Sequence, residues 1–180
     1  MFNRTIIDLC SGTGAWSKPY LEAGYHVLRF TLPDHDVRDL RSHDLGNVYG
    51  VLASPPCTMF AIGGNAWYRS PAEIRDAMSI VDACLRIIVA TRPWFWCLEN
   101  PVGKLVHYLG KPCMYMQPYN YGDDYSKQTC LWGCFNPPAR RPVRKYRKNF
   151  VESVSGSSAQ SLIRSITPGH FARAFFKANQ

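Results

Sequence analysis

The chain has 180 residues, of which 46% are hydrophobic and 19% are charged, and its formal net charge is +8. This length predicts one compact domain over residues 1–180 with its own hydrophobic core. The basic excess favours a polyanionic partner such as nucleic acid, although solubility alone could explain part of it.

The cysteine pattern and the apolar runs exclude several classes of protein. There are seven cysteines, an odd number, and no CxxC pair, which argues against a disulfide framework and a zinc ribbon, so we expect no metal site. No segment reaches the roughly 20 apolar residues of a membrane span, and the first apolar stretch is too short for a signal peptide. We therefore expect a protein of the cytoplasm, in a bacterial cell or a phage-infected host.

The predicted elements alternate between strands and helices along the chain. Residues 5–9 predict a strand, and a glycine turn then leads into a helix over 15–23. Ser70, Pro71 and Glu73 form a capping box that begins a long helix. The remaining predicted elements are strands at 25–32, 48–53 and 94–98 and a last helix at 168–178. This order predicts an α/β fold, with a mostly parallel sheet and helices on both faces.

Three informative segments follow predicted strands, where parallel sheets bind their ligands. In the first, "DLCSGTG", Gly12 and Gly14 allow a tight turn and a close approach of the backbone to a nucleotide-like ligand. Such a GxG turn is as often purely structural as it is part of a ligand site. Asp36, after the second strand, could accept a hydrogen bond from an adenine amino group, or could be an ordinary solvated turn residue.

The second segment, "ASPPC", places Cys57 behind two prolines. A thiolate on a stiff loop is a good candidate nucleophile. The alternative is a buried, inert cysteine, as we interpret Cys84 and Cys97 in their apolar surroundings.

The third segment, "LENP", carries Glu99 at the exit of a very apolar strand. Desolvation there raises the pKa of a carboxyl group and favours a proton donor. Alternatively, or in addition, Glu99 caps a helix in "PVGKLVHYL".

A basic stretch follows the predicted strands. We interpret residues 136–160 as a basic, mobile loop before the final helix. Its cationic residues are Arg140, Arg141, Arg144, Lys145, Arg147 and Lys148.

The segments "DLCSGTGAWS", "ASPPCTMF" and "LENP", in this order and spacing, resemble three motifs of the DNA cytosine-5 methyltransferases. "SLIRSITPGHFARAFF" resembles a shortened closing motif, and residues 117–133 are similar to a segment of compact phage-type members. The resemblance implies a Rossmann-like, S-adenosylmethionine-dependent methyltransferase fold. It also implies a DNA substrate, whose target cytosine is flipped out of the duplex or already single-stranded.

The resemblance also implies roles for single residues. Cys57 would add to carbon 6 of cytosine, and Glu99 would assist at nitrogen 3. The positions that match cofactor contacts for S-adenosylmethionine are Asp8, Gly12, Gly14, Asp36 and Pro55. The positions that match contacts to the substrate are Asn100, Pro101 and Lys127, and the six basic residues of 140–148 would neutralise phosphates.

The chain also departs from the family. Thr31 stands where these enzymes carry an acid for the cofactor ribose, although Asp34 could substitute. Only about 30 residues stand where the family has a large target-recognition domain, so specificity is expected to be short, loose or supplied by a partner subunit. Two alternatives stay open: the same cysteine addition on RNA or a free pyrimidine nucleotide, and a degenerate fold that acts as a DNA-binding or host-interaction module.

Overall fold

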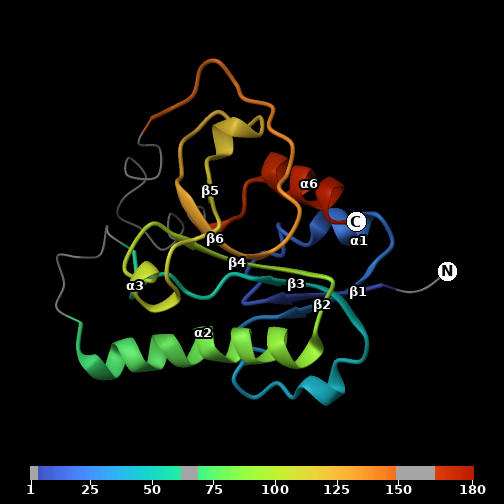
Figure 1. The fold of residues 1–180 in the computed structure, drawn as a ribbon, viewed down its shortest axis with the longest axis vertical. Coiled ribbons are helices and arrows are strands. Elements are labelled where there is room, and N and C mark those ends of the chain that lie inside the picture. The colour runs from blue at the N-terminus through green and yellow to red at the C-terminus, as the bar shows by residue number, and fades with distance from the viewer. Residues whose placement is uncertain (1–3, 62–68, 149–164) are drawn as a thin grey trace.

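A computed structural model describes residues 4–61, 69–148 and 165–180, and contains a six-stranded sheet with helices on both faces (Figure 1). The strand order is β2-β1-β3-β4-β6-β5. The strands are β1 (Thr5–Leu9), β2 (His26–Phe30), β3 (Val48–Ala53), β4 (Phe95–Pro101), β5 (Met114–Met116) and β6 (Thr129–Cys134). The predicted α/β class is therefore confirmed.

The sheet has a parallel half and an antiparallel half. Strands β2, β1, β3 and β4 are parallel, whereas β6 runs antiparallel to both β4 and β5. The predicted strands 5–9 and 48–53 are confirmed with the same bounds, and β2 is shorter than predicted because the chain turns after Phe30, where the His35 amide donates to the Thr31 carbonyl. Strands β5 and β6 were not predicted.

Strand β4 is longer than the sequence indicates. It continues through Pro101, since Glu99, Asn100 and Pro101 pair with residues 129–131 of β6. The prediction of a loop at "LENP" was therefore wrong: Glu99 lies within a strand and caps no helix. The helix expected in the next segment is a single turn, α3 (Val106–Leu109).

Helices cover the two faces of the sheet with separate cores. On one face lies α2 (Pro71–Thr91), and on the other lie α1 (Lys18–Glu22) and α6 (Gly169–Ala178) (Figure 1). Alternate residues of β1 supply the two cores: Ile7 packs on the α2 side and Ile6 on the α1 and α6 side.

The helix termini follow local sequence signals to different degrees. The capping box of α2 is confirmed, with the Ser70 side chain accepting from the Glu73 amide and the Glu73 side chain accepting from the Ser70 amide. Helix α1 begins three residues later than predicted, because residues 15–17 form turns. Cys84 and Cys97 are buried, as expected.

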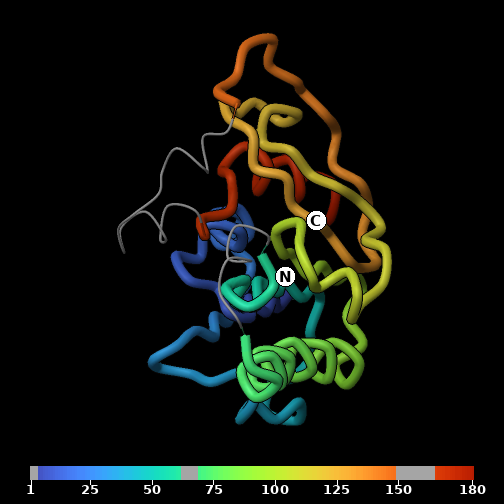
Figure 2. Tube along the Cα trace, turned by 90° about the vertical axis from the view of Figure 1, so that its left-hand side faces the viewer, coloured from blue at the N-terminus to red at the C-terminus, as the bar shows by residue number. Residues whose placement is uncertain are grey.

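Residues 136–148, here called the basic strap, run along residues 117–126 at the top of the molecule (Figures 1 and 2). The Arg141 and Val143 amides donate to the Asn120 and Tyr119 carbonyls, at 2.8 and 2.9 Å. The Tyr119 and Tyr146 rings stack with centroids 4.0 Å apart. These contacts join residues 136–148 to residues 119–120, and the expected mobility of the loop stays a prediction. The rest of the predicted loop, 149–160, lies outside the described residues.

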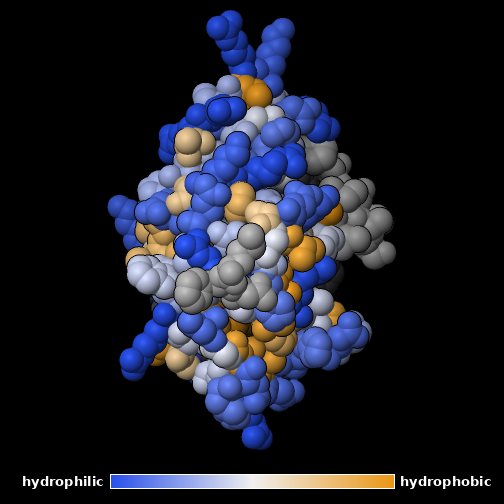
Figure 3. Space-filling view, turned by 90° about the vertical axis from the view of Figure 1, so that its right-hand side faces the viewer, coloured by the Kyte–Doolittle hydropathy of each residue, from blue (hydrophilic) through white to orange (hydrophobic). Residues whose placement is uncertain are grey.

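Hydrophilic and hydrophobic residues are unevenly distributed over the surface. Figure 3 shows mainly hydrophilic residues at the top of one face, at the height of the strap, and hydrophobic residues gathered in its lower half. All six cationic side chains of the strap are exposed. Among the described helices, none combines the length and the apolar content that a membrane span requires.

Candidate active site

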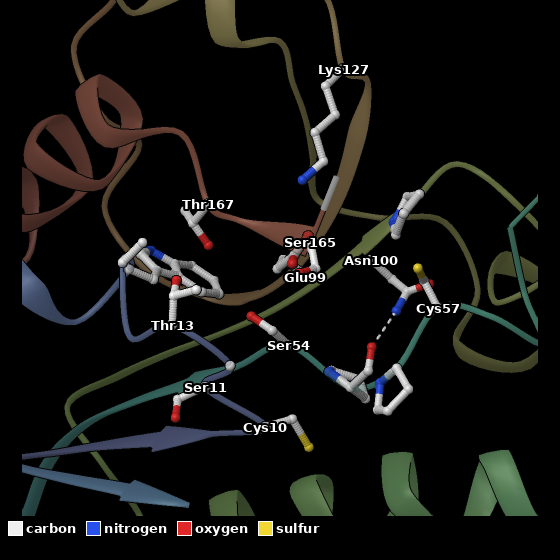
Figure 4. A pocket seen from close by; sticks show the side chains of 16 residues that line it. Cys10, Ser11, Thr13, Ser54, Cys57, Glu99, Asn100, Lys127, Ser165 and Thr167 are labelled. Atoms are coloured by element: carbon white, nitrogen blue, oxygen red, sulfur yellow. Dashed lines mark hydrogen bonds between the residues drawn. The ribbon is translucent and has the colours of Figure 1, made fainter. Parts of the chain in front are cut away.

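A pocket lies where the carboxyl ends of β1, β3 and β4 meet, and all three predicted segments line it (Figure 4). Residues after β1 form one wall, those after β3 a second, and the end of β4 a third. Lys127 and the segment before α6 complete the lining, which is Cys10, Ser11, Gly12, Thr13, Ala15, Trp16, Ser54, Pro55, Pro56, Cys57, Glu99, Asn100, Pro101, Lys127, Ser165 and Thr167.

The glycine turn after β1 needs glycine for its conformation and its contacts. Gly12 and Gly14 have φ values of 49° and 72°, in the left-handed region that favours glycine. Arg29 of β2 donates to the Gly12 carbonyl at 2.8 Å, and its guanidinium lies where a side chain on Gly14 would be, 2.4 Å from an added Cβ. Arg29 therefore holds this turn from outside the pocket.

The loop that carries Cys57 is tied to the end of β4. The Asn100 side-chain amide donates to the Pro55 carbonyl at 2.9 Å, which joins the second and third segments (Figure 4). The Cys57 carbonyl accepts from the Phe60 and Ala61 amides, both at 2.9 Å. Cys57 itself is half-buried and belongs to the lining of the pocket.

Glu99 has a raised pKa, because burial disfavours its charged form. The attraction of Lys127 and a hydrogen bond with Ser54 oppose this shift without reversing it. Lys127 also donates from Nζ to the Ile166 carbonyl at 3.2 Å, so it links the acid to the segment before α6 (Figure 4). Glu99 therefore has the environment of a proton donor.

Two residues expected at the cofactor do not line this pocket. Asp8 is 1% exposed within β1 and accepts a hydrogen bond of 2.5 Å from the Ser17 hydroxyl. Asp36 forms an ion pair with Arg38, which also contacts Asp76 of α2, and this pairing lowers the pKa of Asp36. The six cations of the basic strap also lie outside the lining, whereas Pro55, Asn100, Pro101 and Lys127 belong to it.

Several lining residues were not predicted. Trp16, Ser54 and Thr167 line the pocket from three segments far apart in the sequence. The sequence signal for Trp16 and Ser54 was their place within the first and second motif segments, and that for Thr167 was its place within the segment that resembles the closing motif.

Three buried polar atoms of lining residues have no hydrogen-bond partner within residues 4–61, 69–148 and 165–180: Ser11 Oγ, Trp16 Nε1 and Asn100 Oδ1. Buried polar atoms are normally satisfied by protein, water or ligand, so these three atoms are available to a polar ligand in the pocket.

Known proteins similar to this chain in sequence or in fold include methyltransferases. No protein-family model matches the chain. The type II methyltransferase M1.HphI of Haemophilus parahaemolyticus is 28% identical over an alignment of 131 residues, which covers 59% of this chain and 35% of that protein. An E. coli structure described as a prophage-encoded DNA modification methyltransferase has a TM-score of 0.50 and 17% identity, over 72% of this chain and 46% of that one. Spodoptera frugiperda DNMT2, in a mutant form, has a TM-score of 0.44 and 16% identity, over 86% and 60% of the two chains.

The fold is that of the Rossmann-like methyltransferases. The chain is also similar in sequence to a type II DNA methyltransferase, but it spans only about a third of that relative's length. Within this methyltransferase fold, the pocket occupies the carboxyl edge of the parallel strands, where open α/β sheets bind their ligands.

Proposed function

We propose that this chain transfers a methyl group from S-adenosylmethionine to carbon 5 of cytosine in DNA. The main support is that Cys57, from the loop after β3, and Glu99, from the end of β4, line one pocket together with the glycine turn after β1. A nucleophile and a protonated acid on neighbouring strands suit addition to an electron-poor ring whose nitrogen takes a proton.

The residues of the pocket fit the proposed cofactor. Gly12 and Gly14 keep the wall after β1 free of side chains, and the unpartnered Ser11 hydroxyl and Trp16 indole nitrogen offer polar contacts. When bound, S-adenosylmethionine supplies an electrophilic methyl group. Asp8 and Asp36, which do not line the pocket, stay predictions as cofactor contacts; Asp8 acts on the site through Ser17, whose hydroxyl also lies 3.3 Å from the Gly14 carbonyl.

The proposed reaction uses two side chains of this chain. The Cys57 thiolate forms a bond to carbon 6, and the electron pair of the ring double bond moves to carbon 5. Glu99 holds a proton at nitrogen 3 and so stabilises the electron-rich ring. Carbon 5 would then take the methyl group, with S-adenosylhomocysteine as the leaving group. Carbon 5 would next lose its proton to water, and this electron pair would re-form the ring double bond as the bond between carbon 6 and sulfur breaks and regenerates the thiolate.

The proposed substrate is a cytosine that is flipped out or single-stranded, because carbon 6 is inaccessible inside a duplex. The exposed cations of the basic strap would contact phosphates. A partner subunit is proposed to supply sequence specificity. Because DNA is the proposed substrate, the cytoplasm remains the proposed location of the protein.

The test uses DNA that contains 5-fluorocytosine, together with S-adenosylmethionine. Fluorine cannot leave carbon 5 as a proton does, so the enzyme should remain covalently attached to the base. We expect an adduct with the wild-type protein and with Cys134→Ala, which replaces an exposed cysteine outside the pocket lining, and none with Cys57→Ala.

Other outcomes would contradict the proposal. An adduct only with RNA or with a free nucleotide would support the same chemistry on another acceptor. Retained DNA binding without any adduct would favour a degenerate fold that acts as a binding module.

A further inference from the structure

Trp16 is a buried side chain at the boundary between the pocket and the hydrophobic core. It is 2% exposed and lines the pocket. Its ring meets the Phe175 ring edge-on, with centroids 5.5 Å apart, and the Phe171 ring at 6.4 Å. Both phenylalanines belong to α6, so this helix sets the orientation of the indole.

The indole N–H of Trp16 lacks an acceptor among the described parts of the chain, although the nitrogen is buried. A buried donor without an acceptor is destabilising, and native structures contain few of them. Trp132 provides the contrast within the same molecule, since its Nε1 donates to the Gly110 carbonyl at 2.9 Å. The Trp16 N–H is therefore available to an acceptor that enters the pocket.

The surroundings of Trp16 favour a ligand group that accepts hydrogen bonds. Thr13 of the glycine turn and Thr167 before α6 contribute hydroxyls to the same pocket, and Ser11 adds another hydroxyl without a partner in the described structure (Figure 4). Glu99 is the only carboxylate among the described lining residues, and Ser54 and Lys127 already interact with it. A carboxylate group on the ligand would suit these donors, because an ionised carboxylate only accepts hydrogen bonds and a hydrogen bond to it is stronger than one to a neutral acceptor.

We propose that Trp16 Nε1 donates a hydrogen bond to the carboxylate of the amino-acid part of S-adenosylmethionine, which makes Trp16 a cofactor-binding residue. This inference rests on the proposed function, because it assigns one contact of the cofactor proposed there. The inference also gives α6 a role: by packing on the indole, this helix positions the Nε1 donor of Trp16.

The test compares ligands with and without the carboxylate. Trp16→Phe keeps an aromatic ring against Phe171 and Phe175 but removes the N–H. We expect this variant to bind S-adenosylmethionine and S-adenosylhomocysteine about tenfold to a hundredfold more weakly, and to bind 5′-methylthioadenosine, which lacks the amino-acid part, as the wild-type protein does. Calorimetry measures the three affinities.

Trp132→Phe is the matched control, since it removes an indole N–H whose acceptor lies within the protein. It should lower the melting temperature without changing the three affinities. Unchanged binding of S-adenosylmethionine by Trp16→Phe, or equal weakening of all three ligands, would overturn the inference. If the wild-type protein binds none of the three, the proposed cofactor itself fails, and the inference with it.

A second measurement needs no variant. The indole N–H resonance of Trp16 in the wild-type protein, assigned through its contact with the Phe175 ring, should move downfield with S-adenosylhomocysteine and much less with 5′-methylthioadenosine. Equal shifts with the two ligands would also overturn the inference.

Discussion

Asp8 is a buried carboxyl group with one strong hydrogen bond. Burial raises its pKa from the usual 3.8 to about 7, and the Ser17 hydroxyl and the charge of Arg29 only partly oppose this shift. One oxygen accepts from Ser17, and the other has no partner in the described structure. The neutral acid is therefore the form that the fold prefers.

The raised pKa of Asp8 predicts a pH dependence of stability. Since the folded state binds this proton more tightly than the unfolded chain, the contribution is fully present below about pH 4 and is lost as the pH rises through about 7. The difference amounts to at most about 4 kcal/mol, from about three pKa units at ~1.36 kcal/mol each. Asp8→Asn removes the titration, so urea unfolding between pH 4 and 7 should show a flatter pH dependence than in the wild-type protein. Parallel curves for the two proteins would refute this role.

The outer helix α2 shows which elements local sequence determines. Its start, the proline at the first position and the reciprocal bonds of Ser70 and Glu73 were all predicted, because each depends on residues within one turn. Its burial does not follow from these local signals: the buried residues all lie from Val81 onward, whereas Ile74 near its start is only half-buried. That difference depends on where the sheet lies beneath the helix.

The capping box predicts a measurable contribution of Ser70 to stability. Its hydroxyl accepts from the Glu73 amide at 3.2 Å, so Ser70→Ala should lower the free energy of unfolding by about 1 kcal/mol. Urea unfolding measures the change. Ser79→Ala, the same substitution within the helix, is the control and should stay within about 0.5 kcal/mol of wild type. Equal losses in both variants would contradict the capping role.

The strands β4 and β6 show where local sequence was insufficient. Nothing in "LENP" itself indicates that the strand continues, because the continuation depends on pairing with Thr129, Cys130 and Leu131, about 30 residues later. This pairing places Glu99 on a rigid strand and aligns Asn100 with the Pro55 carbonyl. The acid and the nucleophile are thus held on the sheet and on a loop bonded to it.

On the scale of the whole molecule, the basic strap and the pocket are separate features of one chain. The strap is anchored by backbone bonds to 119–120 and by the Tyr119 and Tyr146 stack, so its cations need little further ordering to meet phosphates. The chain spans 35% of its sequence relative and 46% of its structural neighbour. The proposed function therefore assigns the strap an electrostatic contact with nucleic acid.

Salt titration of DNA binding tests this electrostatic contact. The logarithm of the affinity should fall linearly with the logarithm of the salt concentration, by about 0.9 for each neutralised phosphate of duplex DNA. Arg144→Gln and Lys145→Gln should each reduce the slope by about this amount if each contacts one phosphate. Lys18→Gln, on α1, is the control and should leave it unchanged. A flat salt response of the wild-type protein would exclude the phosphate-binding role of the strap.

By itself, the sequence determined the parallel strands, the start of α2 and the three motif segments of this protein, because caps, glycine turns and apolar periods act over a few residues, whereas β5 and β6 were not predicted. It thereby placed Cys57, Glu99 and the glycine turn at the same edge of a sheet. Only the tertiary structure decided that Trp16 and Thr167 reach the pocket and that Asp8 and Asp36 bond elsewhere, to Ser17 and Arg38. The reason is physical: packing and pairing between distant segments select the partner of each polar group, and local sequence does not encode that choice.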